Sequence, residues 1–304
     1  MKILVIGGTG HVGSFLVPML VKEGHDVFVA TRGNKPLRAD GALKGASFIT
    51  LDATSIESLE ALKGYGFDTV VDFPGTAHNV WQALKNDISH LVATGSLWMF
   101  GYPNVVPTPE IMQNEVRFEG YRKRSKEIHE MAKESGKCKA VFTAIMPPNI
   151  CGPGKIPIDQ LGGRSADAHK ALANGEKVYL PDGPEALIGP CDAEDIATLF
   201  DLAINNRDKA AGEIFNVGAE YSLTYTELIR VFGKIHGKEI PIEYISWQKF
   251  TEEVATNIGA WWHFYAHMRP DITKAKTLLG YKPKYTPEET IARAVKWMKD
   301  ENII

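Results

Sequence analysis

The chain has 304 residues, 44% of them hydrophobic, which suffices for one large or two modest domains with a sizeable core. Lys and Arg total 34 against 37 Asp and Glu, so the net charge of −3 argues against the basic surface that nucleic-acid binding needs. Three scattered cysteines (Cys138, Cys151, Cys191) indicate a reducing compartment, and no apolar stretch reaches the roughly 18 residues of a membrane span, so we expect a cytoplasmic protein that binds neither membranes nor nucleic acid.

The first predicted element is a short apolar run at residues 2–6, typical of a strand buried on both faces. It leads into glycines and then into a helical run at residues 12–22, where Pro18 predicts a kink or an irregular turn. Glycines let the backbone turn tightly beside a pyrophosphate, and the helix aims its free N–H groups and positive dipole end at that group. Gly8, Gly10 and Gly13 satisfy G-x-G-x-x-G, and Gly7, Gly10 and Gly13 satisfy the wider G-x-x-G-x-x-G. This order of elements predicts a dinucleotide site formed by Gly7, Thr9, Gly10, His11, Val12 and Gly13.

Strand and helix signals alternate through the first half of the chain. Such alternation is typical of a parallel sheet covered by helices. We therefore predict an α/β fold of the Rossmann type, with a doubly wound parallel sheet. Further strands are predicted at residues 26–30, 47–50, 69–73, 90–93 and 139–145, and helices at 55–62 and 116–134.

After residue 151 the alternation gives way to chain rich in Gly and Pro. This change predicts a dinucleotide-binding Rossmann domain over residues 1–155 and a smaller mixed α/β substrate region over residues 156–304. Helices are predicted at residues 192–205 and 224–236. A strand near residues 213–218 lies between them, and we expect it to return to the main sheet.

Several motifs follow the glycine turn in a fixed order: Asp52 after the third strand, then Thr94–Ser96, Met99–Gly101, Pro147–Gly154, Asp192–Ala197, Phe215–Gly218 and Asp271–Lys276. Together they resemble the extended short-chain dehydrogenase/reductase family, the NAD-dependent epimerase/dehydratases. The resemblance spans nearly the whole chain. It implies a Rossmann domain that binds NAD or NADP, a C-terminal region that shapes the pocket of a small-molecule substrate, and a homodimer formed through a helix bundle.

The end of the second strand bears on which dinucleotide binds. An acid there would bind the ribose 2′-hydroxyl, whereas a neutral residue followed by arginine accommodates a 2′-phosphate. Here Thr31 precedes Arg32, with Lys35 nearby and no acid, so we favour NADP(H) over NAD(H). The alternative is that Arg32 is a solvated charge, or stacks on adenine while NAD is used.

The resemblance implies further cofactor contacts. Asp52 would hydrogen-bond the adenine amino group, and the alternative is that it caps the next helix. Phe73 and Pro147 would also contact the cofactor, and Asn149 would lie near the nicotinamide or the substrate.

The chemistry of the family rests on a Ser or Thr, a Tyr, and a Lys four residues after the Tyr, a spacing that puts the last two on one helix face. The lysine lowers the phenol pKa from its reference of about 10, so the phenolate can take a proton as hydride leaves. Ser96 matches the serine. Matching Lys126 to the lysine puts Arg122 at the tyrosine position, whereas matching Tyr121 to the tyrosine puts Ser125 at the lysine position. Tyr121 and Lys126 differ by about 140° around a regular helix, so they share a face only if the first turn is irregular, for which a π-bulge would suffice.

Other features bear on the substrate and the partners. Many nucleotide-sugar members of the family carry an arginine where this chain has residues 187–190, and its absence weakens a nucleotide-sugar interpretation. The aromatic run at residues 261–265 suits an apolar or aromatic substrate, or else ordinary core and interface packing. His263 and His267 stand four residues apart without a third ligand, so we expect no metal. A basic helical patch comprises Arg117, Arg122, Lys123, Arg124 and Lys126. This patch is either a solvated face or an RNA-binding surface like that of a few plastid relatives.

Two functional hypotheses follow. The first is an NAD(P)-dependent oxidoreductase, epimerase or dehydratase that acts on a carbinol or carbonyl centre. In it Ser96 hydrogen-bonds the reacting oxygen, Tyr121 relays its proton, and Lys126 binds ribose hydroxyls and tunes that proton. Two alternatives remain open: another group replaces tyrosine as the catalytic base, or the protein has lost the hydride-transfer chemistry. The second hypothesis is a non-catalytic NAD(P)-binding sensor or RNA-associated scaffold of the same fold, motivated by the displaced Tyr and Lys and by the basic patch.

Overall fold

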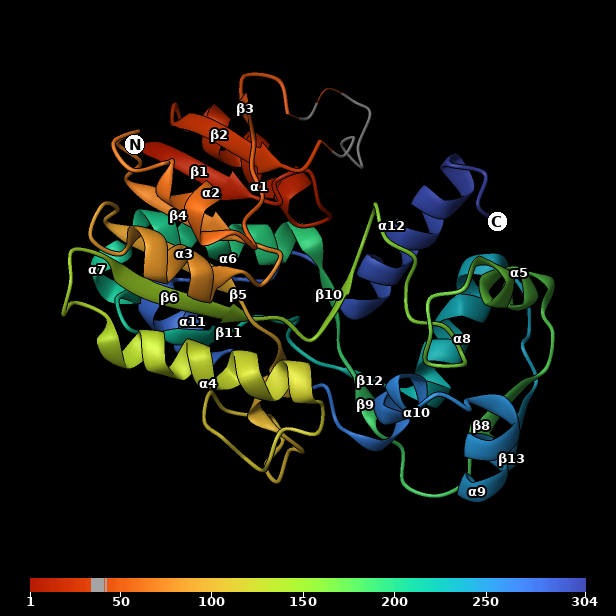
Figure 1. The fold of residues 1–304 in the computed structure, drawn as a ribbon. Coiled ribbons are helices and arrows are strands. Elements are labelled where there is room, and N and C mark those ends of the chain that lie inside the picture. The colour runs from red at the N-terminus through yellow and green to blue at the C-terminus, as the bar shows by residue number, and fades with distance from the viewer. Residues whose placement is uncertain (34–40, 42) are drawn as a thin grey trace.

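A seven-stranded parallel sheet forms the centre of the molecule (Figure 1). The computed structural model describes residues 1–33, 41 and 43–304. The strand order β11-β6-β5-β4-β1-β2-β3 reverses direction between β1 and β4, which confirms the predicted Rossmann-type α/β fold. The strands are β1 (Lys2–Ile6), β2 (Asp26–Thr31), β3 (Ser47–Thr50), β4 (Thr69–Asp72), β5 (His90–Thr94), β6 (Val141–Met146) and β11 (Ile214–Asn216).

The inner strands of the sheet are buried on both faces, because side chains that alternate along a strand meet a layer of helices on either side, whereas the edge strand β3 is largely exposed. In β1, Ile3 and Val5 belong to one apolar cluster, and Leu4 and Ile6 belong to the cluster on the other side. The first face is covered by α1 (Gly13–Lys22), α6 (Ala193–Asn205), α7 (Arg207–Ala210) and α11 (Thr273–Leu279), and the second by α2 (Ile56–Glu60), α3 (Ala77–Leu84) and α4 (Glu119–Glu134).

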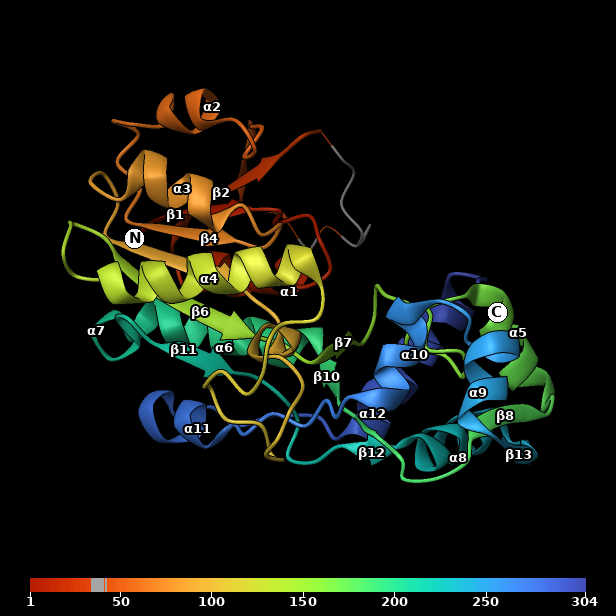
Figure 2. The same cartoon turned by 60° about the horizontal axis from the view of Figure 1, so that its bottom comes forward.

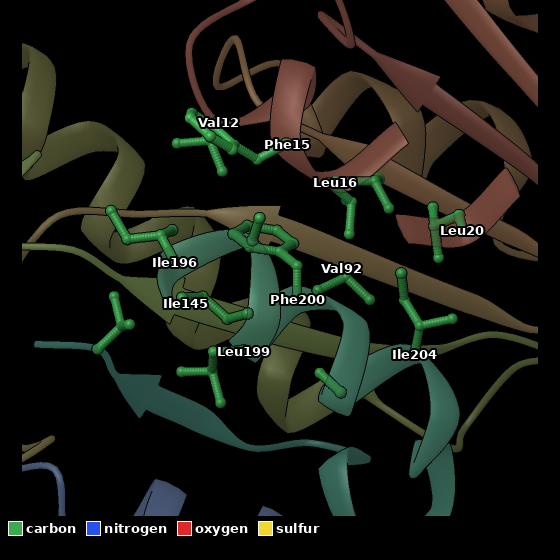
Figure 3. Close-up of a cluster of buried hydrophobic side chains, with 14 of the residues drawn as sticks. Val12, Phe15, Leu16, Leu20, Val92, Ile145, Ile196, Leu199, Phe200 and Ile204 are labelled. Carbon is green, nitrogen blue, oxygen red and sulfur yellow. The ribbon is translucent and has the colours of Figure 1, made fainter. Parts of the chain in front are cut away.

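Helix α1 is fixed to the sheet by its apolar side chains. Figure 3 shows Leu16 and Leu20 in the layer between α1, α6 and the strands, and both are fully buried. Burying one leucine contributes roughly 1.5–3 kcal/mol. Pro18 lies inside α1, yet the helix runs from Gly13 to Lys22 without a break, so the predicted irregular turn is absent. The packing of this helix outweighs the hydrogen bond that the proline cannot donate.

The helix predicted at residues 116–134 begins later than expected, at Glu119. Phe118 is extended, with φ −95° and ψ 128°, and stands just before the first turn of α4. Its ring stacks on Trp98 with the centroids 5.2 Å apart. This tertiary contact keeps residue 118 outside the helix, and Arg122 Nε closes the helix end by donating to the Val116 carbonyl (3.1 Å).

The remaining elements gather beyond the carboxyl ends of the sheet strands, around a third apolar cluster that includes Leu172, Leu228, Phe232 and Val295 (Figure 2). The helices are α5 (Ala166–Asn174), α8 (Tyr225–His236), α9 (Trp247–Lys249), α10 (Ile258–Tyr265) and α12 (Pro287–Asp300), with a π-helical turn at Phe250–Val254. The strand pairs are β7 (Asn149–Cys151) with β10 (Pro190–Asp192), β9 (Leu187–Ile188) with β12 (Leu223–Thr224), and β8 (Val178–Pro181) with β13 (Ile242–Ile245).

The chain crosses between its two parts more than once. Strand β11 pairs in parallel with β6, and α6 and α11 cover one face of the sheet, although all three lie beyond residue 156. The division into residues 1–155 and 156–304 stays a prediction. No helix in the described ranges has both the length and the apolar character that crossing a membrane requires.

The turn between β1 and α1 depends on glycines at two positions. Gly7 has φ +76°, in the left-handed region that favours glycine, and its N–H donates to the Ala30 carbonyl (3.0 Å). At Gly13, a Cβ would lie 2.6 Å from both Cα and O of Gly8. Backbone, not a flexible side chain, occupies that space, so a side chain at residue 13 forces α1 away from the turn.

Gly13→Ala is expected to lower the free energy of unfolding by about 1–3 kcal/mol, the usual cost of overpacking a close contact. Urea unfolding followed by circular dichroism measures it. Gly120→Ala is the matched control, because a Cβ at that exposed residue of α4 would have no other heavy atom within 4 Å. There, alanine should be neutral or stabilise by a few tenths of a kcal/mol. Equal effects of the two substitutions would contradict the close-contact explanation.

Candidate functional site

A cavity of about 550 Å³ opens at the carboxyl ends of the central strands. Its wall contains the glycine turn and residues at or just beyond the ends of β1 to β5. A hollow of similar size, about 540 Å³, lies at the opposite end of the sheet, beside Asn205–Lys209. Ligands of doubly wound sheets bind outside the carboxyl ends of the strands, where the strand order reverses. The first cavity is therefore the candidate ligand site.

Most of the predicted cofactor-binding residues line this cavity: Gly7, Thr9, Gly10, His11, Val12, Gly13, Thr31, Arg32, Asp52 and Phe73. Pro147 and Asn149 are not part of its lining. The Pro147 carbonyl instead accepts from Leu97 N–H (3.0 Å), and Asn149 Oδ1 accepts from Gly189 N–H (3.0 Å). Four further residues that line the cavity were not predicted from the sequence: Pro74, Thr76, Thr94 and Ile150. Their positions at or near the ends of strands could have indicated that they belong to the site.

The glycine turn fits a pyrophosphate. The N–H groups of Ser14 and Leu16 are used within the first turn of α1, donating to Gly10 and Val12 carbonyls. Within the described ranges, no acceptor is found for the N–H groups of His11 and Val12, which stand at the start of this ten-residue helix and line the cavity. Unpaired N–H groups at a helix N-terminus attract an anion. Gly10 and Gly13 carry no side chain, so this turn packs tightly, and Gly10 presents bare backbone to such a group.

At the far side of the cavity, Arg32 and Asp52 lie beyond the ends of β2 and β3. Asp52 Oδ1 accepts from both the N–H (3.0 Å) and the hydroxyl (2.7 Å) of Thr54, and these bonds lower the pKa of the Asp52 carboxyl, with a smaller contribution from Arg32. Helix α2 is capped by Ser55, so Asp52 stabilises the preceding turn and does not cap the helix. Lys35, the second cation predicted near the 2′-position, lies outside the described residues.

The structure does not bring Tyr121 and Lys126 together. Helix α4 is regular from Glu119 onward, so the irregular first turn that the pair required is absent. The Lys126 side chain is 79% exposed, and its ammonium lies 3.9 Å from the Glu130 carboxylate. Tyr121 instead packs edge-on against Trp98, with the ring centroids 5.7 Å apart. Lys126 therefore does not reach the Tyr121 phenol.

Ser125 and Ser96 occupy the other positions that the family pattern singles out. Ser125, one turn after Tyr121, is buried and donates its hydroxyl to the Met99 carbonyl (2.8 Å), so a neutral group stands where the pattern has lysine. Ser96 begins the 3₁₀ helix η1 (Leu97–Phe100), where its Oγ accepts from Trp98 N–H (3.3 Å). Accepting that bond leaves the hydroxyl proton of Ser96 available for a ligand oxygen.

The basic patch of α4 is largely neutralised by acids on the same segment. Arg122 lies 3.2 Å from Glu115, and Lys123 lies 3.9 Å from Glu127, in the same way as Lys126 pairs with Glu130. Exposed pairs of this kind contribute little to stability. Their presence favours the solvated-face interpretation of this patch.

The aromatic run at residues 261–265 joins the two parts of the molecule. Trp262 is buried, and its ring contacts Phe118 edge-on with the centroids 5.9 Å apart. His263 lies 4.7 Å from the Trp98 ring, and its Nδ1 lies within hydrogen-bonding distance of Asn149 Nδ2 (3.2 Å). These contacts correspond to interface packing, the second of the two interpretations.

The imidazoles of His263 and His267 have different partners. His267 Nδ1 accepts from the N–H of Leu187 (3.1 Å), whereas His263 faces Asn149. Within the described ranges, no group of three or more His, Cys, Asp or Glu side chains is placed to hold a metal ion.

His11 connects the glycine turn to the loop after β7. Its Nε2 hydrogen-bonds the Pro153 carbonyl (2.9 Å), so the proton of the neutral ring lies on Nε2. Burial lowers the pKa of His11 to about 3, and the nearby charges of Lys155 and Arg164 add to the effect. Arg164 is held in place by the carbonyls of Ile150 (2.9 Å) and Ile156. The ring is therefore neutral beside the helix N-terminus.

A family model described as NmrA-like matches residues 1–300 of the chain. The chain is 26% identical over 306 residues to the chloroplast stem-loop binding protein of 41 kDa b from Arabidopsis thaliana, covering 93% of this chain and 75% of that protein. It is 24% identical over 330 residues to the UDP-glucose 4-epimerase of Corynebacterium glutamicum, covering 96% and 93% of the two chains.

Solved structures show the same fold over the whole chain. The UDP-glucose 4-epimerase of Stenotrophomonas maltophila, with bound NAD and formylated UDP-arabinopyranose, superposes with a TM-score of 0.78 at 17% identity, covering 99% of each chain. The UDP-glucose 4-epimerase of Thermotoga maritima, with UDP-glucose, gives a TM-score of 0.76 at 18% identity, covering 99% of this chain and 100% of that one. At these identities the likeness concerns the fold alone.

The neutral state of His11 predicts a specific acid sensitivity. Between pH 6.5, the ordinary histidine value, and about pH 3, the unfolded chain binds a proton at residue 11 that the folded chain does not. The free energy of unfolding therefore falls as the pH is lowered through this range. His11→Gln should remove a slope of at most about 1.4 kcal/mol per pH unit.

Urea unfolding at a series of pH values measures this slope. Burial also lowers the pKa values of His90 and His263 to about 3. These two histidines contribute the same slope in the wild-type protein and in His11→Gln. Above pH 7 the two proteins should show the same pH dependence, which serves as the internal control. An unchanged slope below pH 6.5 in His11→Gln would show that the folded protein accepts the proton.

Proposed function

The chain belongs to the NmrA-like family, and we propose that it is an NAD(P)-dependent oxidoreductase, epimerase or dehydratase that acts on a carbinol or carbonyl centre of a small molecule. One observation carries this proposal: a single cavity runs from the unpaired N–H groups of His11 and Val12 to Thr94. Ser96 follows Thr94 by two residues, so a dinucleotide in the cavity would have its reactive end beside a hydroxyl donor.

The relatives support the same class of activity. Epimerases from several organisms and a UDP-N-acetyl-alpha-D-glucosaminuronate decarboxylase match the chain over nearly its whole length. One structural neighbour is described with bound NAD. These activities are those of the relatives. Residues 187–190 lack the arginine that many nucleotide-sugar enzymes of the family carry, so the proposal names the reacting centre and not a nucleotide sugar.

In this proposal the protein supplies two groups to the reaction. Ser96 donates its hydroxyl to the reacting oxygen, and the Tyr121 phenol relays the proton of that oxygen. The bound nicotinamide supplies hydride chemistry. Trp98 is linked to both groups, because its N–H donates to Ser96 Oγ and its ring packs against Tyr121. Trp98 would thereby fix the phenol relative to the serine.

The residues at the end of β2 are the basis for proposing which dinucleotide the protein prefers. Thr31 and Arg32 line the cavity where an acid would bind the ribose 2′-hydroxyl, and Arg32 is exposed. A guanidinium there suits a 2′-phosphate, which it can meet through charge-assisted hydrogen bonds. We therefore propose NADP(H) as the preferred cofactor, with NAD(H) as the alternative that the binding experiment distinguishes.

Tyr121→Phe should lower turnover by about 10² or more, the usual scale for a general acid–base group. Turnover is measured across a panel of carbonyl compounds and sugar nucleotides, by nicotinamide absorbance for net oxidation or reduction and by chromatography of the products for epimerisation or dehydration, which leave the nicotinamide unchanged overall. Tyr65→Phe, at an exposed tyrosine near the N-terminal edge of the sheet, is the matched control and should leave turnover unchanged.

Unchanged turnover in Tyr121→Phe would exclude the proton-relay role. Dinucleotide binding without turnover on any compound of the panel would favour the non-catalytic alternative. Failure of the wild-type protein to bind either dinucleotide would contradict the proposed function as a whole.

Arg32→Ala should weaken NADPH binding by about 10- to 100-fold, the cost of losing charge-assisted hydrogen bonds to a phosphate, and should change NADH binding by less than about twofold. Nicotinamide fluorescence titration measures both affinities. Arg207→Ala is the control, because Arg207 is an exposed arginine at the opposite end of the sheet, paired with Asp208. Equal weakening of the two dinucleotides by Arg32→Ala would favour NAD(H) with Arg32 on the adenine.

A further inference from the structure

Arg124 differs from the other cations of α4 because it turns away from solvent. Its Nη2 donates to the Thr94 carbonyl at the end of β5 (2.8 Å). Its guanidinium also lies against Gly75, where the Cβ of any other residue would stand 2.5 Å from Arg124 Cζ. The neighbouring cations Lys123 and Lys126 point to acids on the outer surface of the helix. One positive charge of the former basic patch thus reaches the carboxyl ends of β4 and β5.

The guanidinium lies beside residues that line the cavity. Pro74, Thr76 and Thr94 line the cavity, and Gly75 lies between the first two. The guanidinium is close to the space that a side chain at Gly75 would occupy, and Gly75, with φ +87°, has none. The position of Arg124 therefore depends on glycine at residue 75.

Two buried polar groups, from Thr94 and Asp72, lie near the Arg124 guanidinium. Within the described ranges, Thr94 Oγ1 is buried without a hydrogen-bond partner, although a buried hydroxyl normally has one. Asp72 is fully buried, and its carboxylate accepts from Gly75 N–H (3.0 Å) and Thr76 Oγ1 (2.5 Å). Burial raises the pKa of Asp72, and the charge of Arg124 opposes that effect. Arg124 carries five N–H donors, of which one is accounted for by Thr94.

The sheet order identifies the part of a dinucleotide that would lie here. Arg32 and Asp52, beyond the ends of β2 and β3, mark the adenosine end, and the glycine turn after β1 takes the pyrophosphate. Strands β4 and β5 lie on the other side of β1, so the nicotinamide riboside would meet Thr94. A ribose presents two adjacent hydroxyls, which suit a guanidinium with free donors beside an unpaired threonine hydroxyl.

We propose that Arg124, and not Lys126, is the cation that binds the nicotinamide ribose hydroxyls, with Thr94 Oγ1 as its neighbour. This inference rests on the proposed cofactor binding. Tyr121 and Arg124 are three residues apart and differ by about 60° around a regular helix, whereas Tyr121 and Lys126 differ by about 140°. The phenol and the cation thus lie on one face of α4. A guanidinium stays protonated throughout the physiological range, so this charge does not titrate.

The test separates the two halves of the ligand. ADP lacks the second ribose, whereas ADP-ribose and NADPH contain it. Arg124→Gln should weaken ADP-ribose and NADPH binding by about 10- to 100-fold and leave ADP binding within about twofold. Lys126→Gln, the matched control on the same helix, should change none of the three affinities. Isothermal calorimetry measures all of them without requiring turnover, and Arg124→Lys should restore part of the loss.

Equal weakening of ADP and ADP-ribose by Arg124→Gln would overturn the proposal, because it would assign Arg124 a purely structural role beside Asp72. Loss of ADP-ribose binding in Lys126→Gln would overturn it in favour of lysine. If Arg124→Gln does not fold, Thr94→Val tests the same ribose contact and should weaken ADP-ribose about threefold or more without affecting ADP. Absence of binding of every ligand to the wild-type protein would instead contradict the proposed function.

Discussion

The backbone of α1 touches the backbone of the turn before it at Gly8, because Gly13 has no side chain. This contact places the N-terminus of the helix directly over the end of β1. The buried side chains of Leu16 and Leu20 then anchor the rest of α1 on α6 and the sheet. Since the helix is held at both ends, the unpaired N–H groups of its first turn face the cavity in a fixed direction. The remainder of the site is arranged around that anion position, with Arg32 on one side and Thr94 on the other.

The sheet could be predicted from the sequence because its signal is local. Each inner strand is a short apolar run buried on both faces. The edge strand β3 is largely exposed, yet it has the predicted bounds, Ser47–Thr50. The glycine turn is equally local. The start of α4 could not be predicted in this way, because the stacking of Phe118 on Trp98 decides it. The partners of Asn149 were also beyond sequence reasoning, since Gly189 and His263 come from distant segments.

Helix α4 shows how a sequence pattern can be misread by one residue. The pattern of Tyr121 and Lys126 draws attention to a lysine that the regular helix leaves in solvent. The face that carries Tyr121 also carries Arg124, and spacing alone does not reveal that this side chain turns inward. Its direction is set by the absence of a side chain at Gly75 and by the buried carboxylate of Asp72 beneath it. The relevant information lies in the β4–α3 loop, far from the helix in sequence.

The return of the chain to the sheet after residue 190 has a practical consequence for dissecting the molecule. Strand β11 covers the outer edge of β6, and α6 buries the face that carries Val92 and Ile145 (Figure 3). A fragment that ends at residue 155 would therefore expose an unpaired strand edge and one apolar face, a combination that favours aggregation. Cofactor binding in this protein is best studied in the full-length chain, because the glycine turn and its support are encoded in separate halves of the sequence.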